Sequence, residues 1–341
     1  MTKSRGRTDL SARAAWMYYI GGQTQYEIAD NLGISRQVVQ RLIATASAEN
    51  LVSFQIVHRI SDCATLASAL AKKYDLQLCK VVPSATLDNN ACQQMIASAA
   101  AEVMYRMLMT SQDFTVALGS GRTLRSAIEK MPELIRPQHS CVSLIGAMTA
   151  DGTTTRYDVP LLMAGKTQGK YFILPAPMFA DTPQDRELWC QHRIYKLVTD
   201  KARTADATFL GIGEVSLSCP LCLEGFVSTD EMQQQLEEQA TAEIIGHIIN
   251  REGKRLSNPL QQRLTSAPVA PDPVRPTIAF AGGRTKHRAI RAALRGRWIN
   301  GLVTDEETAR YLLELNLSEG AEPPLQEKAR FGNKKSLSPD G

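Results

Sequence analysis

Hydrophobic residues recur at helical spacing at the start of the chain. The first stretch follows Asp9, which is placed to act as an N-cap, and it ends at Gly21 and Gly22. Residues spaced by three or four positions share one face of a helix, so an amphipathic helix is predicted here. Its apolar stripe is Leu10, Ala14, Met17 and Tyr18.

Capping signals mark the start of two further helices. Thr24 and Glu27 have the spacing of a capping box, in which each side chain satisfies a free amide, and the helix they start is expected to reach Leu32. Gly33 supplies the turn, and Ser35 can cap the next helix. The apolar face predicted for that next helix is Val38, Val39, Leu42 and Ile43.

The opposite face of this last helix carries guanidinium and carboxamide groups. Such groups suit the edges of guanine and adenine, and the phosphates, in a DNA major groove. Two short helices joined by a glycine turn, with the small Ala29 at their contact, form a helix-turn-helix. The pattern predicts DNA binding, and a packing module with a solvated polar face is the alternative. The candidate DNA contacts are Thr24, Gln25, Ser35, Arg36, Gln37, Gln40 and Arg41.

The rest of the chain alternates short apolar runs with amphipathic stretches. A β-leaning stretch over 51–60 and a helical segment ending at Tyr74 lead into it. The clearest amphipathic stretch runs from Ala91 to Met107. This alternation predicts a mainly parallel sheet covered by helices on both faces, with ligands bound beyond the carboxyl ends of its strands. The runs expected to form buried strands are 78–82, 114–118, 142–145, 171–174, 208–212, 244–249 and 278–280.

Glycine-rich loops follow three of these predicted strands. Glycine lets the backbone approach an anion, the start of a helix offers unpaired amides, and cationic and hydroxyl side chains add donors. A glycine turn after a strand is also ordinary connection chemistry, but three such loops together favour a shared phosphate-binding site. The candidate contacts in these loops are Gly119, Ser120, Gly121, Arg122, Thr123, Gly211, Gly213, Gly282, Gly283 and Lys286.

A nucleotide site is not expected. The segment 165–167 resembles the end of a P-loop, but Pro160 occupies the position of the first glycine of that motif and no strand leads directly into it. The loop 119–124 lacks the third glycine of the dinucleotide fingerprint. No cofactor is therefore predicted.

Composition narrows the class of protein. The 341 residues, 43% of them hydrophobic and 22% charged, are ordinary for a globular protein and exceed one average domain. A net charge of +4 allows a polyanionic partner without requiring one. No apolar run approaches the roughly 18 residues that cross a bilayer, and the basic start lacks the apolar region of a secretory signal. A cytoplasmic protein without membrane association is expected.

Cysteine and histidine spacing indicates no metal site. The seven cysteines are odd in number and scattered, so reduced thiols are expected. Only Cys219 and Cys222 have the C-x-x-C spacing, and a zinc site would need two further ligands at comparable spacing. The histidines have no ligand spacing with one another or with cysteine, so surface or hydrogen-bonded core positions are expected for His58, His139, His192, His247 and His287.

Residues 18–42 closely resemble the N-terminal module of the SorC-type sugar-responsive transcriptional regulators. The resemblance rests on the capping box, the glycine turn and the run Ser-Arg-Gln-Val-Val-Gln-Arg at 35–41. Later segments follow the same family in order, so that the resemblance covers about residues 10–315. They are Gly-Arg-Thr (121–123), Leu-Pro-Ala-Pro (174–177), Gly-Ile-Gly (211–213), Ala-Gly-Gly-x-x-Lys (281–286) and Leu-x-Thr-Asp-Glu-x-x-Ala (302–309).

The resemblance implies an α/β protein with two domains. Residues 1–58 would form a helix-turn-helix, winged-helix-like DNA-binding domain. Residues 59–317 would form a Rossmann-like, sugar-phosphate-isomerase-like effector-binding and oligomerisation domain, related to ribose-5-phosphate isomerase and glucosamine-6-phosphate deaminase. The implied effector is a phosphorylated sugar or polyol, and the implied assembly is a homodimer or homotetramer. The tail 318–341 mixes Pro, Gly and both charge signs and is expected to be disordered.

Two positions bear on the identity of the effector. Asp305 suits a helix start, with Glu307 at the reciprocal capping position, and it is also a candidate contact for a sugar hydroxyl. The segment ending at Pro160 departs from the family, and Arg156 adds a cation near the expected pocket. This departure concerns sugar specificity rather than the phosphate site.

These features predict a DNA-binding transcriptional regulator of a carbohydrate or polyol catabolic operon, with double-stranded operator DNA as its partner and a phosphorylated sugar or polyol as effector. The alternative is a sugar-phosphate isomerase or deaminase with a fused DNA-binding module. Such an enzyme needs a positioned carboxylate base and a partner acid. Glu214 and Asp230 follow the 211–213 loop but form no recognisable pair, so no catalytic residue is predicted.

Overall fold

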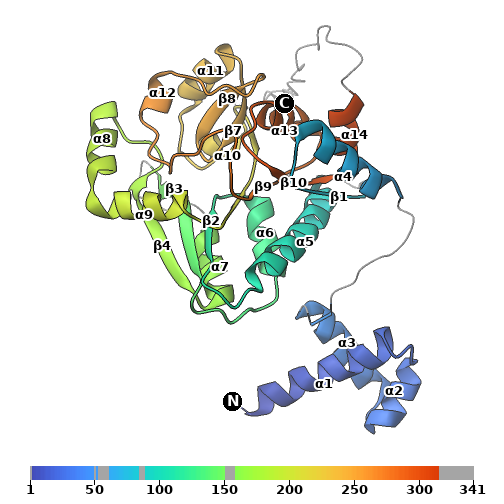
Figure 1. The fold of residues 1–341 in the computed structure, drawn as a ribbon. Helices are drawn as coiled ribbons and strands as arrows, with labels where there is room; N and C mark the ends of the chain where they lie inside the picture. The colour runs from blue at the N-terminus through green and yellow to red at the C-terminus, as the bar shows by residue number, and fades with distance from the viewer. Residues whose placement is uncertain (1, 50, 53–60, 84–88, 150–157, 315–341) are drawn as a thin grey trace, which may run out of the picture.

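The computed structural model describes residues 2–49, 51–52, 61–83, 89–149 and 158–314 (Figure 1). Most of the β-leaning stretch 51–60, Arg156 and the expected tail 318–341 lie outside these ranges, as does the expected domain boundary at residue 58. Within them, the N-terminal helices have a hydrophobic core of their own, and the remaining elements share two larger cores.

The N-terminal helices are α1 (Thr2–Tyr19), α2 (Gln25–Leu32) and α3 (Arg36–Ala48). The predicted capping box is confirmed, because the amide of Thr24 donates to the Glu27 carboxylate at 2.7 Å and the amide of Glu27 donates to Thr24 Oγ1 at 3.3 Å. Gly33 ends α2 with a left-handed φ of 64°, and Ser35 caps α3 as predicted. The side chains buried between the helices are Ala14, Ile28, Val39, Leu42 and Ile43.

The predicted start of α1 is wrong. The helix begins at Thr2, so Asp9 lies inside it rather than at its N-cap. The Asp9 carboxylate accepts a hydrogen bond from Nε of Arg13, one turn later, at 3.0 Å. An aspartate can mark a helix start or pair with an arginine four residues on, and the local sequence does not separate the two.

The larger part of the molecule is a mixed α/β fold built on parallel strands, as predicted. Among the described residues, seven strands lie in the order β1-β10-β9-β5-β2-β3-β4, each parallel to its neighbours. Their bounds are β1 (Leu78–Val82), β2 (Thr115–Leu118), β3 (Ser140–Met148), β4 (Lys170–Pro177), β5 (Ala207–Leu210), β9 (Thr277–Phe280) and β10 (Gly301–Asp305).

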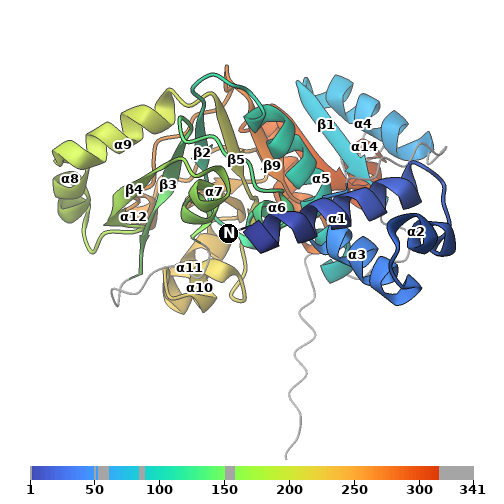
Figure 2. The ribbon, with the colours of Figure 1, turned by 90° about the horizontal axis from the view of Figure 1, so that it is seen from below.

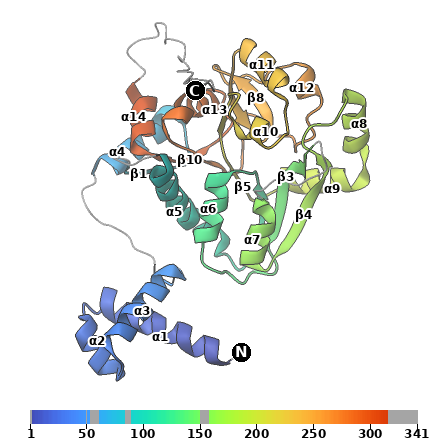
Figure 3. The same ribbon diagram turned by 180° about the vertical axis from the view of Figure 1, so that it is seen from behind.

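Helices cover both faces of this sheet. One face packs against α5 (Asn89–Leu108), α6 (Arg122–Lys130) and α7 (Val159–Thr167), which lie in front of the strands in Figure 2. The core on the other face contains side chains from α4 (Ser61–Tyr74), α9 (Arg193–Arg203), α13 (His287–Arg295) and α14 (Glu306–Glu314). Figures 1 and 3 show α4 and α14 beside the β1 edge, and α9 with α8 (Pro183–Gln191) beside the β4 edge.

Alternate residues of the central strands enter the two cores. Phe209 of β5 and Phe280 of β9 stack with ring centroids 5.5 Å apart on the side of α5 and α6. Their neighbours Leu210 and Ala279 belong to the core on the opposite face. This alternation follows from the two-residue period of a strand, and burial on both faces explains why these strands are apolar throughout.

A small antiparallel sheet lies beyond β5. It consists of β6 (Gly213–Glu214), β7 (Ala240–Ile244) and β8 (His247–Asn250). The single strand predicted over 244–249 is wrong, because the chain turns between β7 and β8 at Ile245 (φ 47°) and Gly246 (φ 87°). A β-branched residue at positive φ is rare, so the isoleucines of this mostly apolar run predict a strand rather than a turn. The short helices α10 (Pro220–Leu223), α11 (Thr229–Glu237) and α12 (Pro259–Gln262) belong to the same region.

Gly253 allows two backbones to touch where the end of β8 meets the end of α13. It has a φ of 80°, and a Cβ at this position would lie 2.3 Å from the nitrogen of Gly296. Its carbonyl accepts a hydrogen bond from Nε1 of Trp298 at 2.7 Å. The positive φ of Gly253 disfavours any other residue, and the contact with Gly296 leaves no room for a side chain.

We expect Gly253→Ala to destabilise the protein more than Gly225→Ala. Gly225 has a similar φ of 74° but no heavy atom within 4 Å of an added Cβ, so its variant carries only backbone strain. Overpacking should add about 1–3 kcal/mol at Gly253, which lowers the melting temperature by several degrees more. Calorimetric melting of both variants measures the difference, and equal shifts would contradict the close backbone contact.

Candidate functional site

The order of the strands reverses between β2 and β5. From β2 the chain continues through β3 to β4 at one edge of the sheet, and from β5 it continues through β9 to β10 toward the other edge. The loops after β2 and β5 therefore leave the sheet in opposite directions and open a crevice, where open α/β sheets bind their ligands. A pocket of about 520 Å³ lies at this point.

The predicted glycine loops meet in this pocket. Because β2, β5 and β9 are neighbours in the sheet, the loops that follow them are neighbours at its carboxyl edge. The residues that line the pocket from these loops include Ser120, Gly121, Arg122, Thr123, Gly211, Gly213, Gly282, Gly283 and Lys286.

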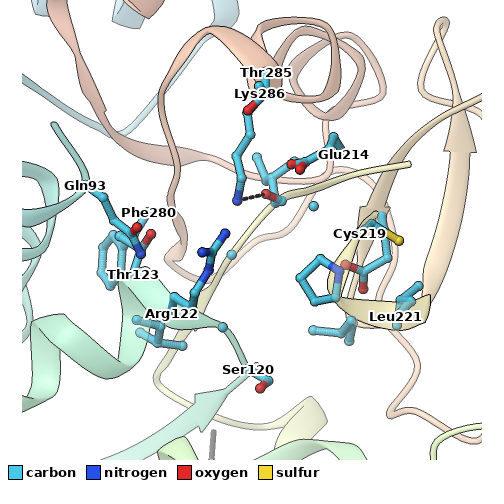
Figure 4. A pocket seen from close by; sticks show the side chains of 18 of the residues that line it. Gln93, Ser120, Arg122, Thr123, Glu214, Cys219, Leu221, Phe280, Thr285 and Lys286 are labelled. Carbon is cyan, nitrogen blue, oxygen red and sulfur yellow. Dashed lines mark hydrogen bonds between the residues drawn. The ribbon is translucent and has the colours of Figure 1, made fainter. Parts of the chain in front are cut away.

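The loop after β2 brings the start of α6 to the pocket. Gly121 is the N-cap of the helix, has a φ of 131°, and carries no side chain that could cap the first turn. The amides there combine with the positive end of the helix dipole. Arg122 and Thr123 line the same space (Figure 4). Gly119 lies just outside the lining, where its amide donates to the carbonyl of Phe209 at 2.9 Å.

Lys286 enters the pocket from the loop after β9, through the 3-10 turn η1 (Arg284–Lys286). Its Nζ donates to the carbonyl of Ile212 at 2.8 Å (Figure 4). Burial lowers the pKa of Lys286 and the charge of Arg122 acts in the same direction, whereas the carboxylates of Glu214 and Glu243 oppose them. Two cations and two carboxylates therefore interact at one end of the pocket.

Glu243 is a pocket residue that the sequence pattern did not indicate. It lies on β7 and accepts a hydrogen bond from the amide of Gly246. Burial raises the pKa of Glu243, while that hydrogen bond and the charge of Lys286 lower it. Gly213 of β6 makes room for the carboxylate, since a Cβ there would lie 2.6 Å from Glu243 Oε2.

The remaining lining comes from elements far apart in the sequence. The polar members Asn90 and Gln93 come from the start of α5, which no motif marks. Glu214, one of the two carboxylates named above, lines the pocket, whereas Asp230 on α11 is exposed and outside the lining. The other members include Ile96, Ile145, Met178, Cys219, Leu221, Phe226 and Phe280.

Comparison with known proteins identifies the family. Residues 58–314 match the sugar-binding domain family, Sugar-bind. The chain belongs to this family. It is 32% identical over 304 residues to the erythritol catabolism regulatory protein EryD of Brucella abortus (strain 2308), covering 89% of this chain and 96% of EryD. It is 30% identical over 315 residues to the transcriptional regulator LsrR of Enterobacter sp. (strain 638), covering 90% and 93% of the two chains.

Solved structures agree with the fold of this sugar-binding domain. The full-length sorbitol operon regulator SorC from Klebsiella pneumoniae superposes with a TM-score of 0.70 at 24% identity, covering 89% of this chain and 98% of SorC. A sor operon regulator from Shigella flexneri superposes with a TM-score of 0.64 at 23% identity, covering 74% and 99%. The resemblance to SorC-type regulators is confirmed.

Asp305 of this sugar-binding domain lies outside the pocket lining, at the end of β10. It is 1% exposed. Its carboxylate accepts hydrogen bonds from the amide of Thr308 at 2.8 Å, from Thr308 Oγ1 at 2.7 Å and from the amide of Gly283 at 2.8 Å. This geometry supports the helix-start interpretation of Asp305 rather than contact with a sugar hydroxyl. The hydrogen bond from the Gly283 amide also fixes the loop after β9. Glu307 forms an ion pair with Arg284 of η1.

The polar face of α3 is exposed as the sequence indicates. Arg36, Gln37, Gln40 and Arg41 are all exposed. Nε of Arg36 donates to Oε1 of Gln25 on α2 at 3.4 Å, and its guanidinium lies 5.1 Å from the ring centroid of Tyr26. The hydroxyls of Thr24 and Ser35 accept hydrogen bonds from the starts of α2 and α3.

The part of the chain that the structure describes contains no group of three His, Cys, Asp or Glu side chains arranged to hold a metal ion. Cys219 and Cys222 are free thiols there, and burial raises the pKa of Cys222 to about 12. Over the same ranges, none of the helices has the length and apolar character required to cross a membrane.

We expect Asp305→Ala to destabilise the ligand-free protein by roughly 2–4 kcal/mol, because it removes a buried helix cap and leaves the half-buried amide of Gly283 without this acceptor. Denaturant unfolding measures the loss, with the exposed Asp230→Ala as the control that changes little. If Asp305→Ala kept its stability and lost only ligand affinity, a direct role in binding would replace the capping role.

Proposed function

We propose that this protein is a DNA-binding transcriptional regulator of a carbohydrate or polyol catabolic operon, and that a phosphorylated sugar or polyol in the pocket modulates its DNA binding. The main support is the pocket itself, in which three glycine loops of a sugar-binding domain meet two cations and a helix start with glycine at its N-cap. The similarity to EryD and LsrR over about nine-tenths of the chain supports the regulatory role.

The phosphate is proposed to bind at the start of α6. Main-chain amides at a helix start and the guanidinium of Arg122 suit a dianion, and Thr123 can add a hydroxyl donor. Lys286 is the less suitable phosphate ligand, because Glu214 and Glu243 already offset its charge. The phosphate is therefore placed at the start of α6, where main-chain amides and Arg122 can contact it together.

The hydroxyl groups of the effector are proposed to bind beside Lys286, Glu214 and Glu243. Carboxylates accept hydrogen bonds from hydroxyls, the ammonium group donates to them, and Gln93 can do both. This arrangement of acceptors and donors suits a polyhydroxylated chain. EryD is by its name a regulator of erythritol catabolism, which favours a polyol or small sugar phosphate for this chain.

The helix pair α2–α3 is proposed to be a helix-turn-helix that reads operator DNA. Its support is the capped helix start, the left-handed turn at Gly33 and the exposed polar face of α3. Gln25 and Tyr26 hold the Arg36 guanidinium at the start of α3, where such helices contact base edges. A homodimer or homotetramer would present two such helices to a repeated operator. The effector would shift DNA affinity by about 1–3 kcal/mol, the usual size of such coupling.

A sugar-phosphate isomerase or deaminase is the second candidate, and one observation favours it. The pocket brings Glu214 and Glu243 close to Lys286, although the sequence showed no carboxylate pair. These groups could exchange protons with a bound sugar. Incubation with pentose and hexose phosphates separates the candidates, because a regulator raises its melting temperature without consuming the ligand.

We expect Arg122→Ala to weaken effector binding at least tenfold, on the order of the 1.5–3 kcal/mol of a charge-assisted hydrogen bond, and Thr123→Ala to weaken it less. Arg125→Ala is the matched control, since Arg125 lies one turn later on α6, pairs with Glu129 and is outside the pocket lining. Thermal-shift screening of pentose, hexose and polyol phosphates finds the effector, and calorimetry compares the variants. Equal affinity of Arg122→Ala and Arg125→Ala would exclude the α6 site.

We expect Arg36→Ala and Gln40→Ala to weaken operator binding by about 5- to 150-fold while effector binding stays intact, because a lost base contact costs about 1–3 kcal/mol. Arg203→Ala, an exposed arginine on α9, is the control for loss of one positive charge. The operator is first selected from random duplexes, and fluorescence anisotropy at constant salt then gives the affinities. Unchanged operator affinity in both variants would show that α3 is not the recognition helix.

A further inference from the structure

A second cavity, of about 300 Å³, lies beside the β7–β8 turn. Its lining comes from α8, α9, β8 and the connection that contains α12, and it shares no residue with the lining of the first pocket. Glu243 and Ile245 face the first pocket, whereas His247 faces the second. The volume is at the lower end of the range that holds small-molecule ligands.

Two buried polar side chains face this cavity without a hydrogen-bond partner among the described residues. His247 and Ser266 are each 5% exposed. By hydrogen-bond distance and angle, neither ring nitrogen of His247 nor Oγ of Ser266 has a partner there, although the main chain of Ala267 lies close enough to the ring to affect its pKa. The expected surface or hydrogen-bonded core position is therefore wrong for His247. Because an unpaired buried polar group costs about 1–3 kcal/mol, such groups usually serve a bound molecule or water.

His247 presents a neutral ring to the cavity. Burial lowers the pKa of His247 to about 3, the charges of Arg255 and Arg186 add to this effect, and the main chain of Ala267 opposes it. The neutral ring has one N–H donor and one acceptor nitrogen, and the Ser266 hydroxyl likewise donates and accepts. A hydroxyl group of a ligand can both donate to and accept from His247 and Ser266, whereas a bare anion or an alkyl group cannot do both.

The rim of the cavity is cationic. Arg186, Lys196 and Arg255 line it, and no aspartate or glutamate appears in the lining drawn from the described residues. Main-chain carbonyls orient both guanidinium groups without neutralising them, because Arg186 donates to Leu264 at 2.8 Å and Arg255 donates to Val269 at 2.7 Å. An oxyanion entering the cavity would meet these positive charges first.

We propose that this cavity is a second ligand site, which takes a small anion that also carries hydroxyl groups. The oxyanion lies between Arg186, Lys196 and Arg255, and a hydroxyl reaches His247 and Ser266. A polyol phosphate and a hydroxy acid share this chemistry, so both are probes. The proposal stands on this cavity alone and does not depend on what the first pocket binds.

The test uses the full chain with Arg122→Ala, which weakens binding in the first pocket. The probes are glycerol 3-phosphate and glycerate. Glycerol lacks the anionic group and inorganic phosphate lacks the hydroxylated carbon chain, so each lacks one of the two required features. We expect one of the first two probes to bind saturably and to shift the ring resonances of His247, identified by their absence in His247→Gln. The probe that binds tells whether phosphate or carboxylate is preferred.

Lys196→Ala should weaken that binding roughly tenfold or more, because it removes a charged contact. Arg193→Ala, exposed on the same helix but outside the lining, should leave it unchanged. Ser266→Ala removes only a hydroxyl and serves as the second variant if His247→Gln does not fold. Unshifted His247 resonances with both hydroxylated anions, or equal binding by Lys196→Ala and Arg193→Ala, would overturn the proposal.

Discussion

The reversal of strand order between β2 and β5 is the constraint on which the first pocket depends. Parallel strands all end at the same edge of a sheet, but helices that cover opposite faces would normally close over that edge. Where the order reverses, consecutive connections diverge and leave an opening. The glycine loops after β2, β5 and β9 surround this opening because these strands are neighbours, although Gly119 in the first loop and Gly282 in the last are 163 positions apart in the chain.

Charged groups of both signs gather in that opening. Arg122 and the start of α6 supply positive potential. Lys286 is held by a main-chain carbonyl, and the charges of Arg122, Glu214 and Glu243 all act on it. A ligand with one anionic end and several hydroxyls fits this mixture of charges better than a dianion alone, since burying an unpaired charge is costly and hydrogen-bonded hydroxyls are not.

The β7–β8 turn connects the two cavities through one residue, Gly246. The amide of Gly246 donates to Glu243 in the first pocket, and the carbonyl of Gly246 accepts from Nε2 of Gln261, at 2.9 Å, in the lining of the second. Ile245 beside it adopts a φ of 47°, a conformation that costs a β-branched residue about 1–2 kcal/mol. Tertiary contacts maintain that strain, and a change in one cavity that moves this turn would reach the other.

Sequence alone determined the features that depend on contacts within a few residues. The capping box at Thr24, the turn at Gly33, the polar face of α3 and the glycine loops after the strands are of this kind, because caps, turns and periodicity are local. The parallel sheet also followed from the alternation of apolar runs and helices.

Only the tertiary structure decided which distant residues share a site. Glu243 reaches the first pocket because an apolar run folds into a hairpin, and His247 faces a different cavity because it lies beyond the turn. Asp305 became a buried cap because β10 inserts between β1 and β9. Strand order and turn geometry depend on packing between segments far apart in the chain, and no local pattern of residue types encodes them.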